Sequence, residues 1–213
     1  MLKANGVSLF PKGHGIVKRW IVLCIALGVF MGTKSIEAQG NPNIEIVSFG
    51  PVDPAVLGYL KKNLSEIFKT QVSIGKSYGL ADFAYNKDRK QYLSTAIIKN
   101  LPRPNDVTPK TLAVIDKDLY VPELHFVFGE AYLLKGTCII SVTRLRQSYY
   151  GLTDNNDLFL KRTLKEAVHE IGHLFNIGHC PNPLCVMHFS NSLPDTDRKD
   201  FHFCDNCKKL LTF

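Results

Sequence analysis

The sequence has no apolar run long enough to cross a membrane as a helix. Its main apolar run, residues 20–31, would extend only about 18 Å as a helix, whereas the hydrocarbon core of a bilayer is roughly 30 Å thick. The 213 residues also contain no internal repeat and no low-complexity segment, which argues against repeat and fibrous architectures. A composition that is 45% hydrophobic is enough for one globular core with a small additional subdomain.

Acidic residues are scarce at the N-terminus, where residues 1–40 hold five basic side chains and only Glu37 as an acidic one. This region accounts for +4 of the formal net charge of +7, so residues 41–213 carry an ordinary +3. A domain with so small an excess of positive charge lacks the basic surface that nucleic-acid binding requires. We therefore expect no nucleic-acid partner.

Residues 1–40 are predicted to be an N-terminal leader. Two basic residues precede the apolar run and small and polar residues follow it, as in a secretory signal peptide. Two alternatives remain open: an uncleaved anchor that contacts the membrane through residues 20–31 only, or an untranslated extension with Met31 as the real start. The protein is expected to be exported or membrane-anchored if residues 18–38 act as a signal, and cytoplasmic otherwise.

The remainder, residues 41–213, has the alternating pattern of one folded α/β (α+β) domain. We predict strands at 44–49, 71–74 and 111–116, helices at 54–69 and 85–101, and a hairpin of two strands at 124–134 and 137–145. A strand–helix–strand unit favours parallel pairing, whereas a hairpin is antiparallel. The sequence therefore predicts a mixed, mostly parallel sheet packed on helices.

The motif His169-Glu170-x-x-His173 lies in a further predicted helix. Residues four apart share one face of a helix, so both imidazoles can bind one metal ion, and Glu170 is rotated about 100° from them, within reach of a metal-bound water. His179 can join them only if the helix ends near Asn176, because a straight helix would carry it about 9 Å past His173. Asparagine readily adopts the left-handed conformation that ends a helix.

The apolar residues of this helix support the same interpretation. Asp157 is the predicted N-cap, and the apolar side chains that follow it fall in one arc of the helical wheel, opposite His169 and His173. The two histidines are thus expected to line a cleft. Histidines that merely point into solvent would lie opposite the same apolar arc, so the arc does not distinguish the two cases. The metal site is therefore inferred from the spacing of the histidines. The apolar arc consists of Leu160, Leu164, Ala167, Val168, Ile171, Leu174 and Phe175.

Four of the six cysteines cluster near the C-terminus: Cys180, Cys185, Cys204 and Cys207. The two-residue gap of the last pair is typical of zinc knuckles, and four thiolates suit a closed, tetrahedral structural zinc site. Two disulfides or a redox-active C-x-x-C pair are the alternatives. Cys138 falls inside a predicted strand, where a buried, inert thiol is expected.

These motifs together resemble the signature of the archaemetzincins, a metzincin-clan family of zinc peptidases. The resemblance covers roughly residues 43–213 and excludes the leader. Asn176 stands where the family usually has glycine. The matching residues are the run from His169 to His179, Cys180, Cys185, Met187 and the Cys204–Cys207 pair, with supporting similarity at residues 119–129, 165–168 and 185–193.

The resemblance implies a role for each of these residues. His169, His173 and His179 would bind a catalytic zinc, Glu170 would be general base and acid, Met187 would form the floor under the metal, and Cys180, Cys185, Cys204 and Cys207 would hold a structural zinc. The implied fold is a metzincin-like mixed sheet on helices, with residues 180–213 as a Cys-rich zinc-binding subdomain. Residues 124–134 would be the edge strand that pairs with an extended substrate.

The predicted function is hydrolysis of peptide bonds in a peptide or protein substrate. The enzyme would be a monomer with two zinc ions, one catalytic and one structural, and Glu170 would take a proton from the metal-activated water and return it to the leaving amine. The alternative is a catalytically inactive, zinc-stabilised peptide-binding protein with the same architecture. The presence of Glu170 counts against that alternative, because binding alone does not need this carboxylate.

Overall fold

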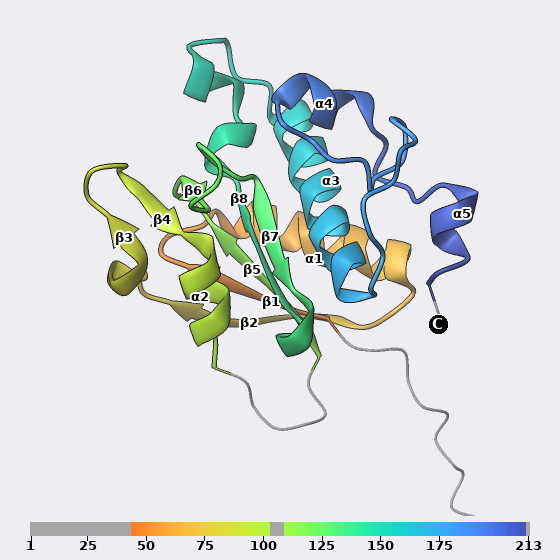
Figure 1. Cartoon of the computed structure of the whole chain (residues 1–213), viewed down its shortest axis with the longest axis horizontal. Helices are drawn as coiled ribbons and strands as arrows, with labels where there is room; N and C mark the ends of the chain where they lie inside the picture. Colours follow the sequence, from red (N-terminus) through yellow and green to blue (C-terminus); the bar gives the residue numbers. More distant parts are fainter. Residues whose placement is uncertain (1–43, 103–108, 212–213) are drawn as a thin grey trace, which may run out of the picture. The chain divides into compact units, whose positions relative to one another are not determined.

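The computed structural model describes residues 44–102 and 109–211 (Figure 1). The predicted leader, with the apolar run at residues 20–31, lies outside these residues. Within the described part of the chain, no helix is both long and apolar enough to cross a bilayer.

A five-stranded mixed sheet forms the centre of the described domain, in the order β2 (Val72–Tyr78), β1 (Ile44–Phe49), β5 (Lys110–Ile115), β8 (Thr137–Ser141) and β7 (Gly129–Tyr132). The first four strands are parallel to their neighbours, and β7 at one edge is antiparallel to β8. The prediction of a mixed, mostly parallel sheet is therefore confirmed, as are the parallel first unit and the final hairpin.

Both faces of the sheet are covered. Helices α1 (Pro54–Phe68) and α3 (Asn156–Leu174) lie on one face, and α2 (Ser94–Asn100) lies on the other with a small sheet of β3 (Tyr85–Asn86), β4 (Gln91–Leu93) and β6 (Leu119–Tyr120) (Figure 1). Successive strand residues point to opposite faces, so neighbours such as Ile46 and Val47 enter different cores. Strands buried on both faces need the continuous apolar runs that this sequence has.

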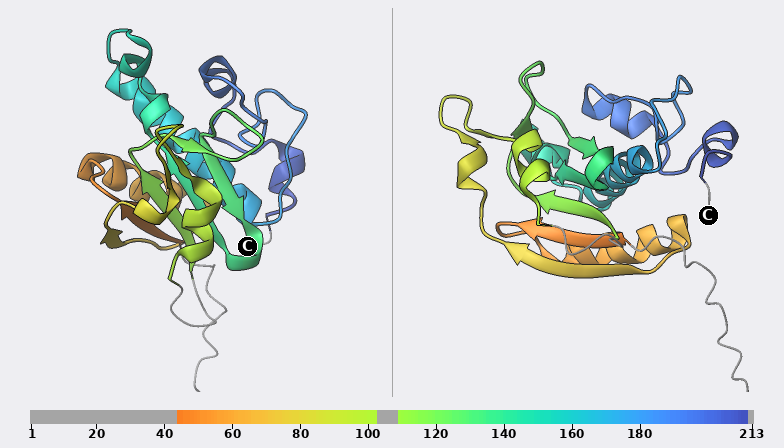
Figure 2. Two further views of the ribbon diagram at one scale, coloured as in Figure 1. Left: turned by 60° about the vertical axis from the view of Figure 1, so that its left-hand side comes forward. Right: turned by 60° about the horizontal axis from the view of Figure 1, so that its bottom comes forward.

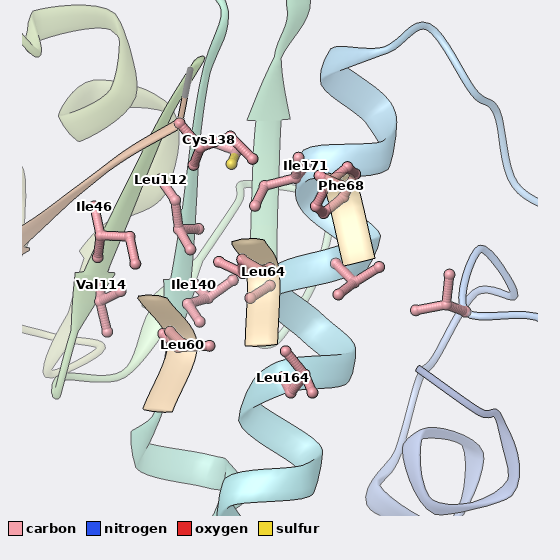
Figure 3. Packing of buried hydrophobic residues seen from close by; sticks show 14 of the residues in the cluster. Ile46, Leu60, Leu64, Phe68, Leu112, Val114, Cys138, Ile140, Leu164 and Ile171 are labelled. Carbon is pink, nitrogen blue, oxygen red and sulfur yellow. The ribbon is translucent and has the colours of Figure 1, made fainter. Parts of the chain in front are cut away.

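The larger core lies between the sheet and the helices α1 and α3. Leu60, Leu64 and Phe68 of α1 and Leu164 and Ile171 of α3 face the sheet side chains (Figure 3). Burying a large aliphatic or aromatic side chain contributes about 1.5–3 kcal/mol. This packing anchors α3 on one side and leaves its opposite side for the histidines.

The prediction of one helix over residues 85–101 is wrong in its first half. The Asn86 side chain accepts hydrogen bonds from the backbone of the next turn, and Lys90 has a φ of +55°. These features reverse the chain, so Tyr85 pairs with Tyr92 across two short strands and the helix begins only at Ser94. Local side-chain bonds of asparagine compete with helix formation in this way.

The predicted strand 124–134 is also shorter in the structure, where β7 contains only Gly129–Tyr132. Arg89 Nη2 donates hydrogen bonds to the carbonyl oxygens of Leu124 (2.8 Å) and His125 (2.9 Å). The carbonyls that would continue the strand are thereby bound by a side chain. Residues 121–128 form a loop instead.

The C-terminal segment after α3 contains the short helices α4 (Leu193–Arg198) and α5 (Asp205–Lys208). This segment lies on the α3 side of the sheet, away from α2 (Figure 2). Three-residue and four-residue 3₁₀ turns complete the connections at Asp82–Ala84, Leu133–Lys135, Thr143–Leu145 and Gln147–Tyr150.

Candidate active site and metal centres

Helix α3 starts and ends with defined caps. The Asn155 side chain accepts a hydrogen bond from the Leu158 amide (2.9 Å), so Asn155 is the N-cap and the prediction of Asp157 is wrong by two residues. At the other end, Asn176 has a φ of +61°, and the Ile177 amide donates to the Gly172 carbonyl at 3.2 Å. This bond and the left-handed residue define a Schellman motif. The break predicted near Asn176 is therefore confirmed.

The turn that ends α3 also orients His173. Because carbonyl oxygens only accept hydrogen bonds, His173 Nδ1 donates to the Ile177 carbonyl (2.8 Å) and His169 Nδ1 donates to the Val186 carbonyl (2.8 Å). In a neutral imidazole the remaining nitrogen, Nε2, then carries a lone pair. The two Nε2 atoms face each other at 3.1 Å. Such bonds to the second nitrogen are typical of metal-binding histidines.

His179 returns to the same point after the turn. Its ring centroid lies 4.9 Å from that of His173 and 5.4 Å from that of His169. One ligand nitrogen from each of the three rings lies within 4.8 Å of the others. The structure therefore brings together the three histidines that the sequence nominated as metal ligands.

The electrostatics of this site favour neutral imidazoles. Burial and then the nearby Lys199 charge lower the pKa of His169 well below its usual value, and burial also lowers the pKa of His173 and His179. Neutral imidazoles are the form that binds metal. The lone pairs of two Nε2 atoms only 3.1 Å apart repel each other unless a cation lies between them. Two nitrogens bound to one tetrahedral zinc ion stand roughly 3.4 Å apart, which is close to this distance. The donor set therefore fits a zinc ion.

Glu170 is buried beside these rings, with 5% of its surface exposed. Burial, followed by the charges of Glu166 and Glu130, raises the pKa of Glu170 well above its usual value, and Lys199 opposes this rise. A cation held by the histidines would oppose it further. A carboxylate with a raised pKa is a better proton acceptor near neutral pH than an ordinary one.

Gly129, the first residue of the edge strand β7, makes this placement of Glu170 possible. A Cβ atom at Gly129 would lie 2.6 Å from both Cγ and Oε1 of Glu170 and 2.7 Å from the Ile139 carbonyl oxygen. Any side chain at this position would displace the carboxylate. The sequence analysis did not identify Gly129; the available signal was a glycine inside the predicted strand 124–134, since glycine within a strand often marks the close approach of another group.

Met187 lies directly under α3 and is fully buried. A Cβ atom at Gly172 would lie 2.4 Å from Met187 Sδ, so the thioether packs against the helix backbone between His169 and His173. This position agrees with a floor beneath the metal-binding rings. Residue 172 has to be small for the methionine to approach so closely.

Two cavities flank Glu170 and His169. The larger, of about 710 Å³, is also lined by His173, His179 and the β7 residues Gly129–Ala131. The smaller, of about 200 Å³, extends towards Glu166 and Ser190. Only the strand β8 pairs with β7 in the described part of the chain, so the backbone of β7 has one unpaired edge along the larger cavity.

Two lysines that the sequence analysis missed contact α3, the helix that carries His169 and His173. Lys110 Nζ donates to the Leu174 carbonyl (2.6 Å) at the C-terminal end of α3, where a cation is favourable. Lys199 is completely buried, and its Nζ lies 3.1 Å from Glu166 Oε1. A lysine deep in a core carries no recognisable sequence pattern, because lysines are mostly exposed.

The four C-terminal cysteines also converge, with all four Sγ atoms within 4.8 Å of one another. All four are free thiols, and Cys180 Sγ lies 3.8 Å from Cys204 Sγ. An S–S bond measures about 2.05 Å, whereas two thiolates on one tetrahedral zinc stand roughly 3.8 Å apart. The arrangement suits a metal site and does not suit a disulfide between this pair.

Backbone amides activate one of these thiols. The Cys207 amide, above all, lowers the pKa of Cys204 to about 7, and the Cys204 amide itself donates to Cys185 Sγ at 3.3 Å. Burial raises the pKa of Cys185 and of Cys207, so these thiols need a cation to ionise. Cys138 is fully buried with a pKa raised by burial, as expected for an inert thiol.

Comparison with known proteins agrees with this geometry. A model of peptidase family M54 matches residues 81–212. The archaemetzincin of Methanocaldococcus jannaschii is 44% identical over 162 residues, which cover 76% of this chain and 88% of that protein. The archaemetzincin of Pyrococcus furiosus is 39% identical over 175 residues, which cover 79% of this chain and 91% of that protein.

Solved structures show the same relationship. The crystal structure of archaemetzincin from Archaeoglobus fulgidus superposes with a TM-score of 0.70 and 38% identity over 79% of this chain and 99% of that one. A zinc-dependent peptidase from Methanocorpusculum labreanum gives a TM-score of 0.73 and 30% identity over 79% of this chain and 100% of that one. The chain therefore belongs to peptidase family M54, the archaemetzincins, and is a zinc metallopeptidase that acts on peptides or proteins.

Proposed function

We propose that the chain binds two zinc ions, one at His169, His173 and His179 and one at the four C-terminal cysteines, and that Glu170 transfers the protons in peptide-bond hydrolysis. The observation that carries this proposal is the pair of Nε2 atoms, 3.1 Å apart, that face each other beside a buried carboxylate. Three neutral imidazoles leave the full charge of a divalent cation available to a substrate.

Residues of the chain transfer the protons and bind the substrate backbone in this reaction. A zinc ion, when bound, supplies a Lewis acid that acidifies water and polarises a carbonyl group. Glu170 accepts the proton of the attacking water and returns it to the leaving amine. The unpaired edge of β7 binds the substrate backbone as an added strand, which places a peptide in the larger cavity next to Glu170.

The Glu170→Gln variant tests this proposal. The amide keeps the shape of the side chain but cannot take a proton, so we expect kcat/KM on a peptide library to fall about 10²- to 10⁴-fold. Zinc content measured on the purified protein should remain at two equivalents. A variant that hydrolyses as fast as the wild type would refute the role of Glu170.

The same experiment addresses the inactive peptide-binding alternative. Under that alternative, the zinc-loaded wild type would bind peptides without cleaving them, and Glu170→Gln would change nothing. Metal analysis also tests the second ion separately, because Cys204→Ser should remove one zinc equivalent and His179→Ala the other. A single equivalent in the wild type would exclude the proposed count of two.

A further inference from the structure

The smaller cavity beside Glu170 has mostly apolar walls. Its apolar lining includes Leu124, Phe126 and Phe128 of the loop before β7, and Phe189 of the C-terminal segment. The rings of Phe126 and Phe128 meet edge to face with centroids 5.2 Å apart. An apolar cavity of about 150 Å³ holds one benzene molecule, so this cavity of about 200 Å³ has room for one aromatic side chain.

Polar groups of the cavity lining are left available to a ligand. Glu166, 3% exposed, accepts a hydrogen bond through Oε1 from Thr196 Oγ1 (3.0 Å), and the same oxygen forms an ion pair with Lys199 Nζ (3.1 Å). Its other oxygen has no partner among the described residues. Ser190 also lines the cavity, and its buried Oγ makes no hydrogen bond within residues 44–102 and 109–211. Buried hydroxyl groups nearly always have a partner.

The charges around the cavity select the kind of group that can fill it. Lys199 already compensates Glu166, so a second cation would pair with Glu170, favour the charged form of that carboxylate and make it a weaker proton acceptor. A carboxylate would face both Glu166 and Glu170. A neutral hydroxyl avoids both costs, because it can donate to Glu166 Oε2 and accept from Ser190 Oγ at the same time.

We propose that this cavity selects a tyrosine side chain in the substrate, next to the peptide bond that is cleaved. The inference rests on the peptidase function proposed above and adds a substrate class to it. The aromatic ring fills the apolar part of the cavity, and the phenol hydroxyl supplies the missing partners of Glu166 and Ser190. Phenylalanine fits the walls but leaves both polar groups unpaired.

The experiment uses the full-length, zinc-loaded protein and matched peptides that carry tyrosine or phenylalanine on either side of the cleaved bond. We expect kcat/KM to favour tyrosine about 10- to 100-fold, the range for hydrogen bonds to a charged group. Ser190→Ala should reduce this ratio at least threefold. Ser73→Ala, an exposed change on β2 at the opposite edge of the sheet, should leave the ratio unchanged.

A binding measurement separates this inference from the peptidase proposal. Fluorescence anisotropy of labelled peptides on the Glu170→Gln variant reports tyrosine selectivity without turnover. Tighter binding of the tyrosine peptide supports the inference even if the wild type cleaves nothing, in which case only the peptidase proposal fails. Equal cleavage or equal binding of the two peptides, or a tyrosine preference that persists in Ser190→Ala, overturns it.

Discussion

The two clusters proposed to bind metal, the three histidines and the four C-terminal cysteines, differ in what holds their side chains in place. His169 and His173 sit on a 19-residue helix that packs on the sheet, and backbone carbonyls fix both rings, while His179 follows the turn that ends this helix. The cysteines sit on loops and on the four-residue helix α5. The histidine cluster is thus built by the fold, whereas the cysteine cluster has little regular structure of its own to hold it.

We therefore expect metal binding to have different consequences at the histidine cluster and at the cysteine cluster. A site that is organised before the metal arrives spends little binding energy on ordering the chain, so its metal remains available for chemistry. A site formed by loops uses the binding energy to fold them. Substitutions at each cluster, and at the contact between the two regions, test this expectation.

Cys204→Ser should have the largest effect on stability. Loss of a structural zinc removes binding energy that folds the C-terminal segment, so we expect the free energy of unfolding to fall by more than about 3 kcal/mol and the melting temperature by more than about 6 °C. His179→Ala, at an exposed ligand of the other cluster, should remove one zinc with little change in melting temperature. Equal melting curves for the two variants would contradict the comparison.

Lys199→Met tests the contact that joins the two regions. The lysine belongs to the C-terminal segment and pairs with Glu166 of α3 in a fully buried position. Removing one partner of a buried ion pair leaves an uncompensated charge, so we expect a loss of about 3–5 kcal/mol in urea unfolding. The double variant Glu166→Gln/Lys199→Met should recover most of this loss. If the double variant is as unstable as the single one, the charge is not the cause.

Gly129→Ala should disturb the histidine region alone. The added Cβ would lie 2.6 Å from the Glu170 carboxylate, and overpacking of this kind costs about 1–3 kcal/mol. We expect a lower kcat together with this loss of stability, and unchanged zinc at the cysteines. Gly58→Ala is the matched control, since a Cβ atom there meets nothing within 4 Å and alanine favours the helix α1. A kcat equal to that of the wild type would rule out the proposed close approach.

Asn176→Ala should have the smallest effect. Alanine in the left-handed conformation costs about 1–2 kcal/mol, whereas Asn176→Gly should be neutral or slightly stabilising. Because the same turn places the Ile177 carbonyl that holds His173, the alanine variant should also bind zinc more weakly at the histidines. Competition with a chelator measures this affinity. Equal stability of the alanine and glycine variants would show that the turn is not strained.

Much of the fold could be predicted from local patterns. The helix α1 follows from Asp53 as N-cap, Pro54 at its first position and the apolar period that ends before Lys69, and the structure reproduces all three. The segment 85–101 could not be predicted in this way, because its apolar residues suit a helix and a strand equally. Its first half is decided by the Asn86 turn and by pairing with β6, a strand distant in sequence.

Local sequence patterns were enough to indicate which side chains can bind metal, where α3 must end and which segments form the parallel sheet. Those features depend on the spacing of residues along one element and on the conformational preference of a single asparagine. The three-dimensional packing is needed to see that Gly129 makes room for Glu170, that Lys199 compensates Glu166, and that Ser190 borders the smaller cavity. The first two contacts join residues 41 (170 − 129) and 33 (199 − 166) positions apart, the third lies at the junction of several elements, and no local pattern encodes them.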